Sequence, residues 1–321
     1  MRYLDPRADL TFKKVFGEHP DLVISFLNAL LPFDDENKIE SVEYIPTELV
    51  PDNPLKKNSI VDVRCKDQRG RQFLVEMQMI WSEEFKQRVL FNASKAYVRQ
   101  LDKKEDYDLL QPVYSLNLVN DVFEPKLKEY YHHYDIVNVE HSDRVIEGLH
   151  LVFVELPKFK PHNFSERKMQ VLWLRYLTEM GSAHEVPKDL LDNPEVKKAC
   201  DILEESSYSP AQLEGYEKFW DIVRTEKTYY NSARRHGFAV GREEGRAEGR
   251  AEGREEGLAE GREEGRAEGR AEGRAEGREE GRAEGAREEK IRMAKKLKEL
   301  GLSNGQIADT TGLTVKEIEE L

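Results

Sequence analysis

The sequence predicts an α/β fold, with a mixed central sheet flanked by helices, followed by a long charged repeat and a small helical tail. Three observations support this. Short apolar runs typical of strands are interspersed with helical patterns over residues 1–238. A Gly-Arg-Ala/Glu-Glu repeat occupies residues 239–287, and amphipathic sequence returns over residues 288–321. We therefore expect three parts with these boundaries.

Hydrophobic spacing and helix-breaking residues locate the elements of the first part. Helix 20–31 should end before Pro32, and residues 82–103 carry a broad apolar stripe at helical spacing. The expected elements, in order, are helices 8–17 and 20–31, strand 39–46, hairpin strands 59–66 and 72–79, helix 82–103, strands 112–119 and 149–156, and a mostly helical section 165–238.

A β-hairpin is predicted over residues 59–79, because apolar residues alternate on both sides of a glycine-containing turn. Pairing Lys66 with Gln72 places Asp62 opposite Glu76. This register separates apolar from polar side chains, as a half-buried hairpin requires. The apolar face would carry Val61, Val63, Cys65, Phe73, Val75, Met77 and Met79. The other face would carry Asp62, Arg64, Glu76 and Gln78.

Opposed carboxylates at Asp62 and Glu76 would repel each other unless a proton or a cation lay between them. Mg²⁺ is typically bound by one or two carboxylates together with phosphate and water. An ordinary solvated face would also account for two acidic residues. Glu76, however, lies within an apolar run typical of a central strand, where a charge usually needs a partner. The hairpin therefore predicts a divalent-metal site.

The spacing of Asp62 from Glu76-Met77-Gln78 resembles the Asp…Glu-x-Lys signature of the PD-(D/E)XK nuclease superfamily. The chain is more closely similar to the Rpn family of recombination-promoting nucleases and transposases. The resemblance covers roughly the first 230 residues. Its segments are Asp9–Gly17, Ser59–Val63, Val75–Gln78, Arg88–Tyr97 and Pro112–Leu118.

This resemblance implies a PD-(D/E)XK nuclease-like fold and metal-dependent cleavage of DNA phosphodiesters that promotes recombination or transposition. Asp62 and Glu76 would hold Mg²⁺ (or Mn²⁺), with the backbone carbonyl of Met77 as a further ligand. Gln78 occupies the position of the superfamily's lysine. A glutamine can orient water by hydrogen bonding but supplies no positive charge.

Four further residues are candidates for contacts with phosphate or with the metal ligands. Lys13 or Lys95 could supply the missing charge, and Arg88 could contact a phosphate. Asp9 and Lys13 share one side of the first expected helix. Each lysine could equally be an ordinary surface residue. Asp9 could instead form an i,i+4 ion pair or cap the helix.

A net charge of −13 is unfavourable for a protein that binds DNA. Binding would need a local basic patch or a metal ion. Such a patch could form near the hairpin from Lys56, Lys57, Arg64, Lys66, Arg69 and Arg71. Two other functions remain open: a nuclease fold with weak or no activity that acts in nucleic-acid binding or protein assembly, and an RNA nuclease using the same metal chemistry.

The two cysteines, Cys65 and Cys200, form neither a disulfide framework nor a zinc motif, which fits a reducing cytoplasm. The sequence has no signal peptide and no long apolar run, so we expect no membrane association. We expect His132, His133 and His141 in a surface connection, without the paired spacing that predicts a metal site.

Glycine recurs at every fourth position from Gly241 to Gly285. Each glycine costs a helix interior about 1 kcal/mol relative to alanine. On a helix, however, the glycines would form one stripe that turns by about 40° per repeat. The segment could be a long, self-associating helix or a disordered charged linker.

The last 34 residues, 288–321, predict a small helical tail similar to a helix-turn-helix unit. Residues 288–300 should form a helix, and Ser303–Gln306 and Thr314–Glu317 match capping boxes. The final helix carries several glutamates, which match DNA phosphates poorly. This composition favours a docking unit over a DNA reader.

Overall fold

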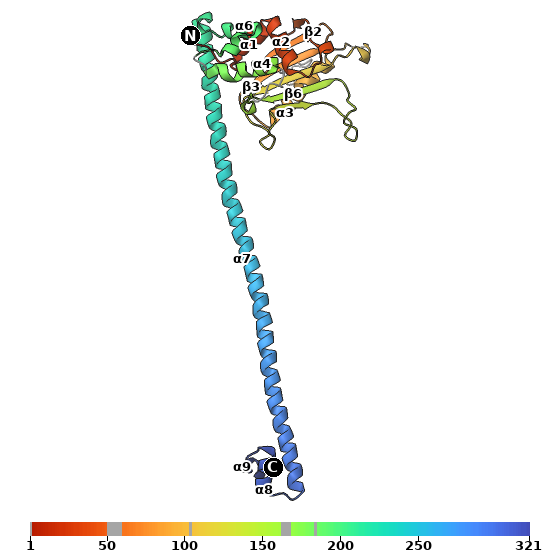
Figure 1. Ribbon diagram of the computed structural model, residues 1–321, viewed down its shortest axis with the longest axis vertical. Coiled ribbons are helices and arrows are strands. Elements are labelled where there is room, and N and C mark those ends of the chain that lie inside the picture. Colours follow the sequence, from red (N-terminus) through yellow and green to blue (C-terminus); the bar gives the residue numbers. More distant parts are fainter. Residues whose placement is uncertain (1, 50–59, 103–104, 162–167, 183–184) are drawn as a thin grey trace. The chain divides into compact units, whose positions relative to one another are not determined.

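A computed structural model describes residues 2–49, 60–102, 105–161, 168–182 and 185–321 (Figure 1). Within these residues a mixed six-stranded sheet has the order β1-β2-β3-β4-β6-β5. The β3–β4 and β4–β6 pairs are parallel and the other pairs antiparallel. The strands are β1 (Val42–Tyr44), β2 (Val63–Asp67), β3 (Gln72–Gln78), β4 (Val113–Val119), β5 (Tyr131–Tyr134) and β6 (Leu149–Glu155).

Helices cover both faces of this sheet (Figure 1). One face packs against α1 (Asp9–Gly17), α2 (Pro20–Leu30), α4 (Lys168–Glu179) and α6 (Pro194–Ile202). The other face packs against α3 (Glu84–Val98). The expected mixed α/β fold is therefore confirmed.

Buried aromatic rings form the centre of the larger core, between the sheet and the four-helix layer. The fully buried rings there are Phe12, Phe16, Phe26, Phe73, Trp173 and Tyr176. Shorter elements connect the layers: helix α5 (Lys188–Leu191) and 3-10 turns at Asp35–Asn37, Tyr107–Leu109, Leu156–Lys158, Met180–Ser182 and Glu205–Ser207.

The β2–β3 hairpin has the register expected from the sequence. Lys66 pairs with Gln72, and the ladder ends where Val63 pairs with Val75. Asp62 therefore lies one residue beyond the last pair, at a bend in the chain. Because of this bend, Val61 does not join Val63 in the larger core as expected. It packs instead in the cluster beneath α3.

Strand β5 was not expected from the sequence, which placed His132 and His133 in a surface connection. Both histidines lie in β5, which pairs antiparallel with β6. The strand has only four residues, and none of them is aliphatic. Its composition therefore lacks the alternation of apolar residues that identifies a strand in sequence.

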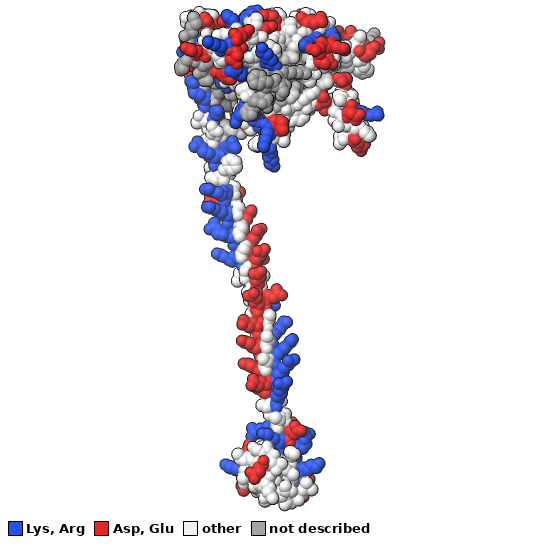
Figure 2. Space-filling view, in the orientation of Figure 1, with Lys and Arg blue, Asp and Glu red and all other residues white. Residues whose placement is uncertain are grey.

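The repeat is helical. It forms part of α7 (Pro210–Glu299), which also contains all but the last residue of the helix expected at 288–300. Repeat side chains are exposed, and a Cβ added at any repeat glycine would meet nothing within 4 Å. Arginines and glutamates gather on different sides of a winding strip without charge (Figure 2). This winding follows from a four-residue period on a helix with 3.6 residues per turn.

The tail contains α8 (Asn304–Thr311) and α9 (Val315–Glu319), and both expected capping boxes are present. Gly312 ends α8 with φ +70°, a conformation that favours glycine. Ala294, Ile307, Leu313 and Ile318 form a small buried cluster. Contacts divide the chain into two units, residues 1–232 and 233–321. Among the described helices, none has the length and apolarity needed to cross a membrane.

Candidate metal and phosphate site

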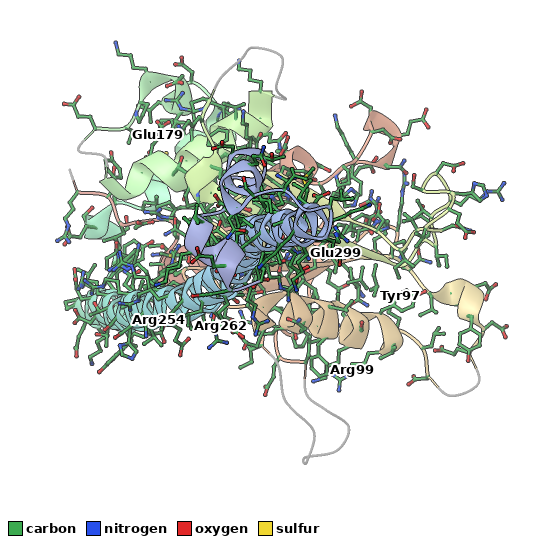
Figure 3. The ribbon with its side chains drawn as sticks, turned by 90° about the horizontal axis from the view of Figure 1, so that it is seen from below. Tyr97, Arg99, Glu179, Arg254, Arg262 and Glu299 are labelled. Atoms are coloured by element: carbon green, nitrogen blue, oxygen red, sulfur yellow. The ribbon has the colours of Figure 1, made fainter. Side chains whose placement is uncertain are left out.

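A pocket of about 720 Å³ lies between the β2–β3 hairpin and the first turns of α3. In Figure 3, Tyr97 and Arg99 mark the C-terminal end of α3. The pocket brings together five residues selected from the sequence: Asp62, Glu76, Met77, Gln78 and Arg88. Its other lining residues are Ile60, Ser82, Glu84, Phe85, Gln87, Phe91 and Asn92.

Each carboxylate is held by a hydrogen bond. The backbone N–H of Met77 donates to Oδ2 of Asp62 over 2.7 Å. This hydrogen bond takes the place of a further backbone bond between β2 and β3, because their ladder ends at the Val63–Val75 pair. The side-chain amide of Asn92 donates to Oε1 of Glu76 over 2.8 Å. Oε2 of Glu76 lies 3.5 Å from Nη2 of Arg88. Glu76 is only 7% exposed, so its orientation is fixed by these contacts.

Burial raises the pKa of both carboxyl groups. The charge of Asp62 raises the pKa of Glu76 further, which means that the two carboxylates oppose each other's ionisation. Arg88 acts in the opposite direction on both pKa values. The pair is therefore a site where a cation would offset two poorly solvated negative charges.

Gln78 binds protein groups through both ends of its amide. Its Nε2 donates to the carbonyl of Ile80 over 2.6 Å, and its Oε1 accepts from Nη2 of Arg88 over 2.6 Å. The guanidinium of Arg88 also lies 4.7 Å from the centre of the Phe85 ring. In this arrangement, Gln78 holds the positively charged guanidinium of Arg88 at the edge of the pocket, beside Glu76.

Lys13 and Asp9 lie near the pocket without lining it. They form an i,i+4 ion pair of 2.5 Å on α1, with both side chains about half exposed. Lys13 lowers the pKa of Asp62 and Asp9 raises it, which places this side of α1 close to the carboxylates. Asp9 does not cap α1, because the N-cap position is Ala8.

Lys95 is directed to a different contact. Its Nζ donates to the backbone carbonyl of Leu49 and lies 5.5 Å from the Phe91 ring centre. It is not among the residues that line the pocket. Of the three cationic candidates, Arg88 is therefore the one that faces the cavity.

Asn92 is a site residue that sequence reasoning missed. It is fully buried on α3 and holds Glu76. A signal was available, because Asn92 follows Arg88 by four residues and interrupts the apolar stripe formed by Val89, Ala93 and Ala96. A buried amide on such a stripe needs a hydrogen-bond partner.

The basic residues of the hairpin are engaged within the protein. Arg71 pairs with buried Asp67, Lys66 pairs with Glu43, and Arg64 donates to Gln72. Arg69 donates to Asn37 and to the carbonyl of Glu36. Lys56 and Lys57 lie outside the described residues. The four described residues stabilise the hairpin and its surroundings, and none of them lines the pocket.

A family model described as PD-(D/E)XK nuclease family transposase matches residues 6–233. The comparisons with curated proteins and with solved structures returned no match. The matched segment contains the sheet, α3 and every site residue selected from the sequence. The chain therefore belongs to the PD-(D/E)XK nuclease family transposases.

Proposed function

We propose that this protein is a Mg²⁺- or Mn²⁺-dependent DNA endonuclease that hydrolyses phosphodiester bonds and thereby promotes recombination or transposition. The observation that carries the proposal is a pair of carboxylates, buried Glu76 and partly buried Asp62, which line one pocket and raise the cost of each other's charge. Family membership supports nuclease chemistry, with DNA as the substrate class.

The donor set fits a hard divalent cation. Asp62 and Glu76 supply carboxylate oxygens, and the Met77 carbonyl is the third ligand that we propose. The N–H of Met77 is directed toward Asp62, and a strand residue directs its N–H and C=O to the same side. Bound there, Mg²⁺ would polarise the scissile phosphate and lower the pKa of a water ligand.

Arg88 replaces the charge that the superfamily's lysine supplies. Its guanidinium can form bidentate hydrogen bonds to phosphate oxygens and can offset the negative charge that develops during cleavage. Gln78 positions it by accepting its hydrogen bond, and Phe85 supports the guanidinium plane. In this proposal, Gln78 acts through Arg88, and any contact of its amide with water requires one of its two present bonds to open.

A plasmid-nicking assay tests the proposed activity. Full-length protein is incubated with supercoiled DNA and Mg²⁺, Mn²⁺ or EDTA, and Asp62→Ala is compared with wild type. Asp201→Ala is a matched control, because Asp201 is an exposed carboxylate on α6 paired with Lys197. We expect nicking by wild type and by the control with either metal, and none with EDTA or with Asp62→Ala.

Undiminished cleavage by a folded Asp62→Ala protein would remove this site from the reaction. Absence of cleavage by wild type under all conditions would favour the alternative function, in which the fold binds nucleic acid or assembles with protein without hydrolysis. A parallel assay with RNA of the same sequence separates the two nucleic-acid substrates.

We also propose that the repeat helix self-associates in parallel. Within one helix, arginines follow each other at i,i+4, as do glutamates, and such like-charge pairs destabilise it. Relative to each glycine, the following arginine lies about +100° around the helix and the preceding glutamate about −100°. Two parallel helices that meet along glycine would therefore place arginine beside glutamate. An antiparallel pair would place like charges together.

A further inference from the structure

A second polar cluster lies at the other end of the sheet. His133 lies on β5, Asp135 comes directly after this strand and two residues after His133, and His150 lies on β6. The ladder pairs Tyr134 with Leu151, and its next position would place Asp135 opposite His150. Two imidazoles and a carboxylate therefore share one face of a two-stranded edge.

Ring nitrogens from both histidines converge on a single oxygen of Asp135. Nε2 of His133 lies 3.0 Å from Oδ1, and Nδ1 of His150 lies 2.7 Å from the same atom. One ligand atom from each residue lies within 4.8 Å of the other two. A tetrahedral Zn²⁺ ion with bonds of 2.0–2.2 Å separates its ligand atoms by about 3.4 Å. Movements of less than about 1 Å would produce this spacing.

His150 is built into the fold. It is 6% exposed, and its ring stacks on Tyr114 with centres 4.3 Å apart. Its Nε2 is buried and makes no hydrogen bond, although it lies 3.1 Å from a carboxylate oxygen of Glu147. Its other ring nitrogen, Nδ1, faces Oδ1 of Asp135 over 2.7 Å, where it can serve as a metal ligand.

We propose that His133, Asp135 and His150 bind one Zn²⁺ ion that fastens the edge strand β5 to β6. Two imidazoles and one carboxylate are an established ligand set for zinc, with water completing the coordination. Glu147 would orient His150 from its other nitrogen, as carboxylates commonly do for metal-bound histidines.

This site is separate from the carboxylate pocket. His150 lies two strands from β3 in the sheet order. Tyr114, on which His150 stacks, itself stacks on Phe73 in the larger core. Glu76 lies three residues further along β3 and faces α3. Alternation along the strand therefore puts the two sites on opposite faces of the sheet.

Zinc titration by calorimetry tests the proposal. The full-length protein carries Asp62→Asn and Glu76→Gln, so that the carboxylate pocket does not contribute, and is freed of metal with a chelator. In this background, the substitutions His133→Ala and Asp135→Asn each remove one ligand and leave the buried residue His150 unsubstituted. His141→Ala is the control, because His141 lies in the same β5–β6 connection, outside the cluster.

We expect one Zn²⁺ per chain in the background protein and in the His141→Ala control. We expect at least about tenfold weaker binding in His133→Ala and in Asp135→Asn. Zinc should also raise the melting temperature of the control but not of the two ligand variants. No zinc binding by the background protein, or binding by the ligand variants as tight as by the control, would overturn the proposal. The cluster would then be two histidines hydrogen-bonded to an aspartate.

Discussion

The proposed chemistry of the carboxylate pocket depends most on Arg88, the cation that we propose in place of the superfamily's lysine. It contacts both Gln78 and Glu76, whereas Lys13 pairs with Asp9 and Lys95 donates to the carbonyl of Leu49. Gln78 on β3 therefore lies beside a cation from α3, which our proposal uses in place of the superfamily's lysine.

We expect Arg88→Ala to lower the rate of DNA nicking by about 10²-fold, because it removes the charge nearest the developing phosphate anion. Arg88→Lys should retain part of the activity, since lysine keeps the positive charge but cannot form bidentate hydrogen bonds to the phosphate. Arg99→Ala, at the C-cap of the same helix, is the control. Initial rates on supercoiled plasmid measure the effect, and full activity in Arg88→Ala would rule out this role.

The raised pKa of Glu76 predicts how stability depends on pH in metal-free protein. Burial favours the protonated carboxyl in the fold. The protonated Glu76 carboxyl therefore stabilises the fold fully below the ordinary glutamate pKa of 4.5. This stabilisation is lost as the pH rises through the raised pKa of Glu76.

Glu76→Gln should consequently be more stable than wild type at neutral pH in EDTA, because glutamine can keep the bond to Asn92 without a charge. The advantage should shrink as the pH falls toward 4.5. Urea midpoints at several pH values measure this. A midpoint difference that is constant with pH would show that ionisation of Glu76 does not govern the effect.

At the scale of elements, the turn between β2 and β3 fixes the register that brings Asp62 to Met77. Gly70 has φ +82°, a conformation that costs other residues about 1–2 kcal/mol. We expect Gly70→Ala to lower the free energy of unfolding by about that amount and to slow nicking.

Gly257→Ala provides a contrasting control in the repeat. Its Cβ would meet no atom within 4 Å, and alanine favours a helix over glycine by about 1 kcal/mol. Helical content measured by circular dichroism should rise or stay constant. Equal destabilisation by the two substitutions would contradict the assignment of Gly70 to a strained turn.

The hairpin and the helices around it were predictable because their patterns are local and long enough to be unambiguous. Alternation predicted which side chains share a face with Glu76, and the capping boxes predicted where α8 and α9 begin. Strand β5 was not predictable, because four polar and aromatic residues carry no period. The bend at Asp62 was also missed, since the sequence pattern continues through it.

Contacts between elements distant in sequence were beyond prediction from the sequence alone. The bond from Arg88 to Gln78 depends on how α3 crosses β3, and the cluster around His150 depends on the pairing of β5 with β6. The residue types were visible in both cases. Only the packing showed which of them meet.

At the scale of the molecule, the nuclease-family region and the repeat have opposite physical characters. The first buries aromatic and aliphatic side chains between layers. The repeat exposes its charged side chains to solvent; Figure 3 shows side chains, including Arg254 and Arg262, extending outward from α7. A chain with net charge −13 gains little from long-range attraction to DNA, so we expect the pocket to account for most of the productive contact.

We expect a chain ending at residue 238 to keep nicking activity and to lose self-association. The first turns of α7 must be retained, because Tyr216 and Trp220 pack with Leu4 and Ala8. Light scattering measures the mass of the full and shortened chains, and the plasmid assay measures activity. Identical oligomeric states for the two chains would contradict self-association through the repeat.

The proposal that Asp62 and Glu76 share one divalent ion is tested most directly by measuring Mn²⁺ binding through the loss of the free-ion electron paramagnetic resonance signal. The protein carries His133→Ala, which removes the second proposed site. We expect one tightly bound Mn²⁺ per chain, weakened at least about tenfold by either Asp62→Asn or Glu76→Gln, because each supplies a charged ligand. Unchanged Mn²⁺ affinity in either variant would contradict a metal ion held jointly by Asp62 and Glu76.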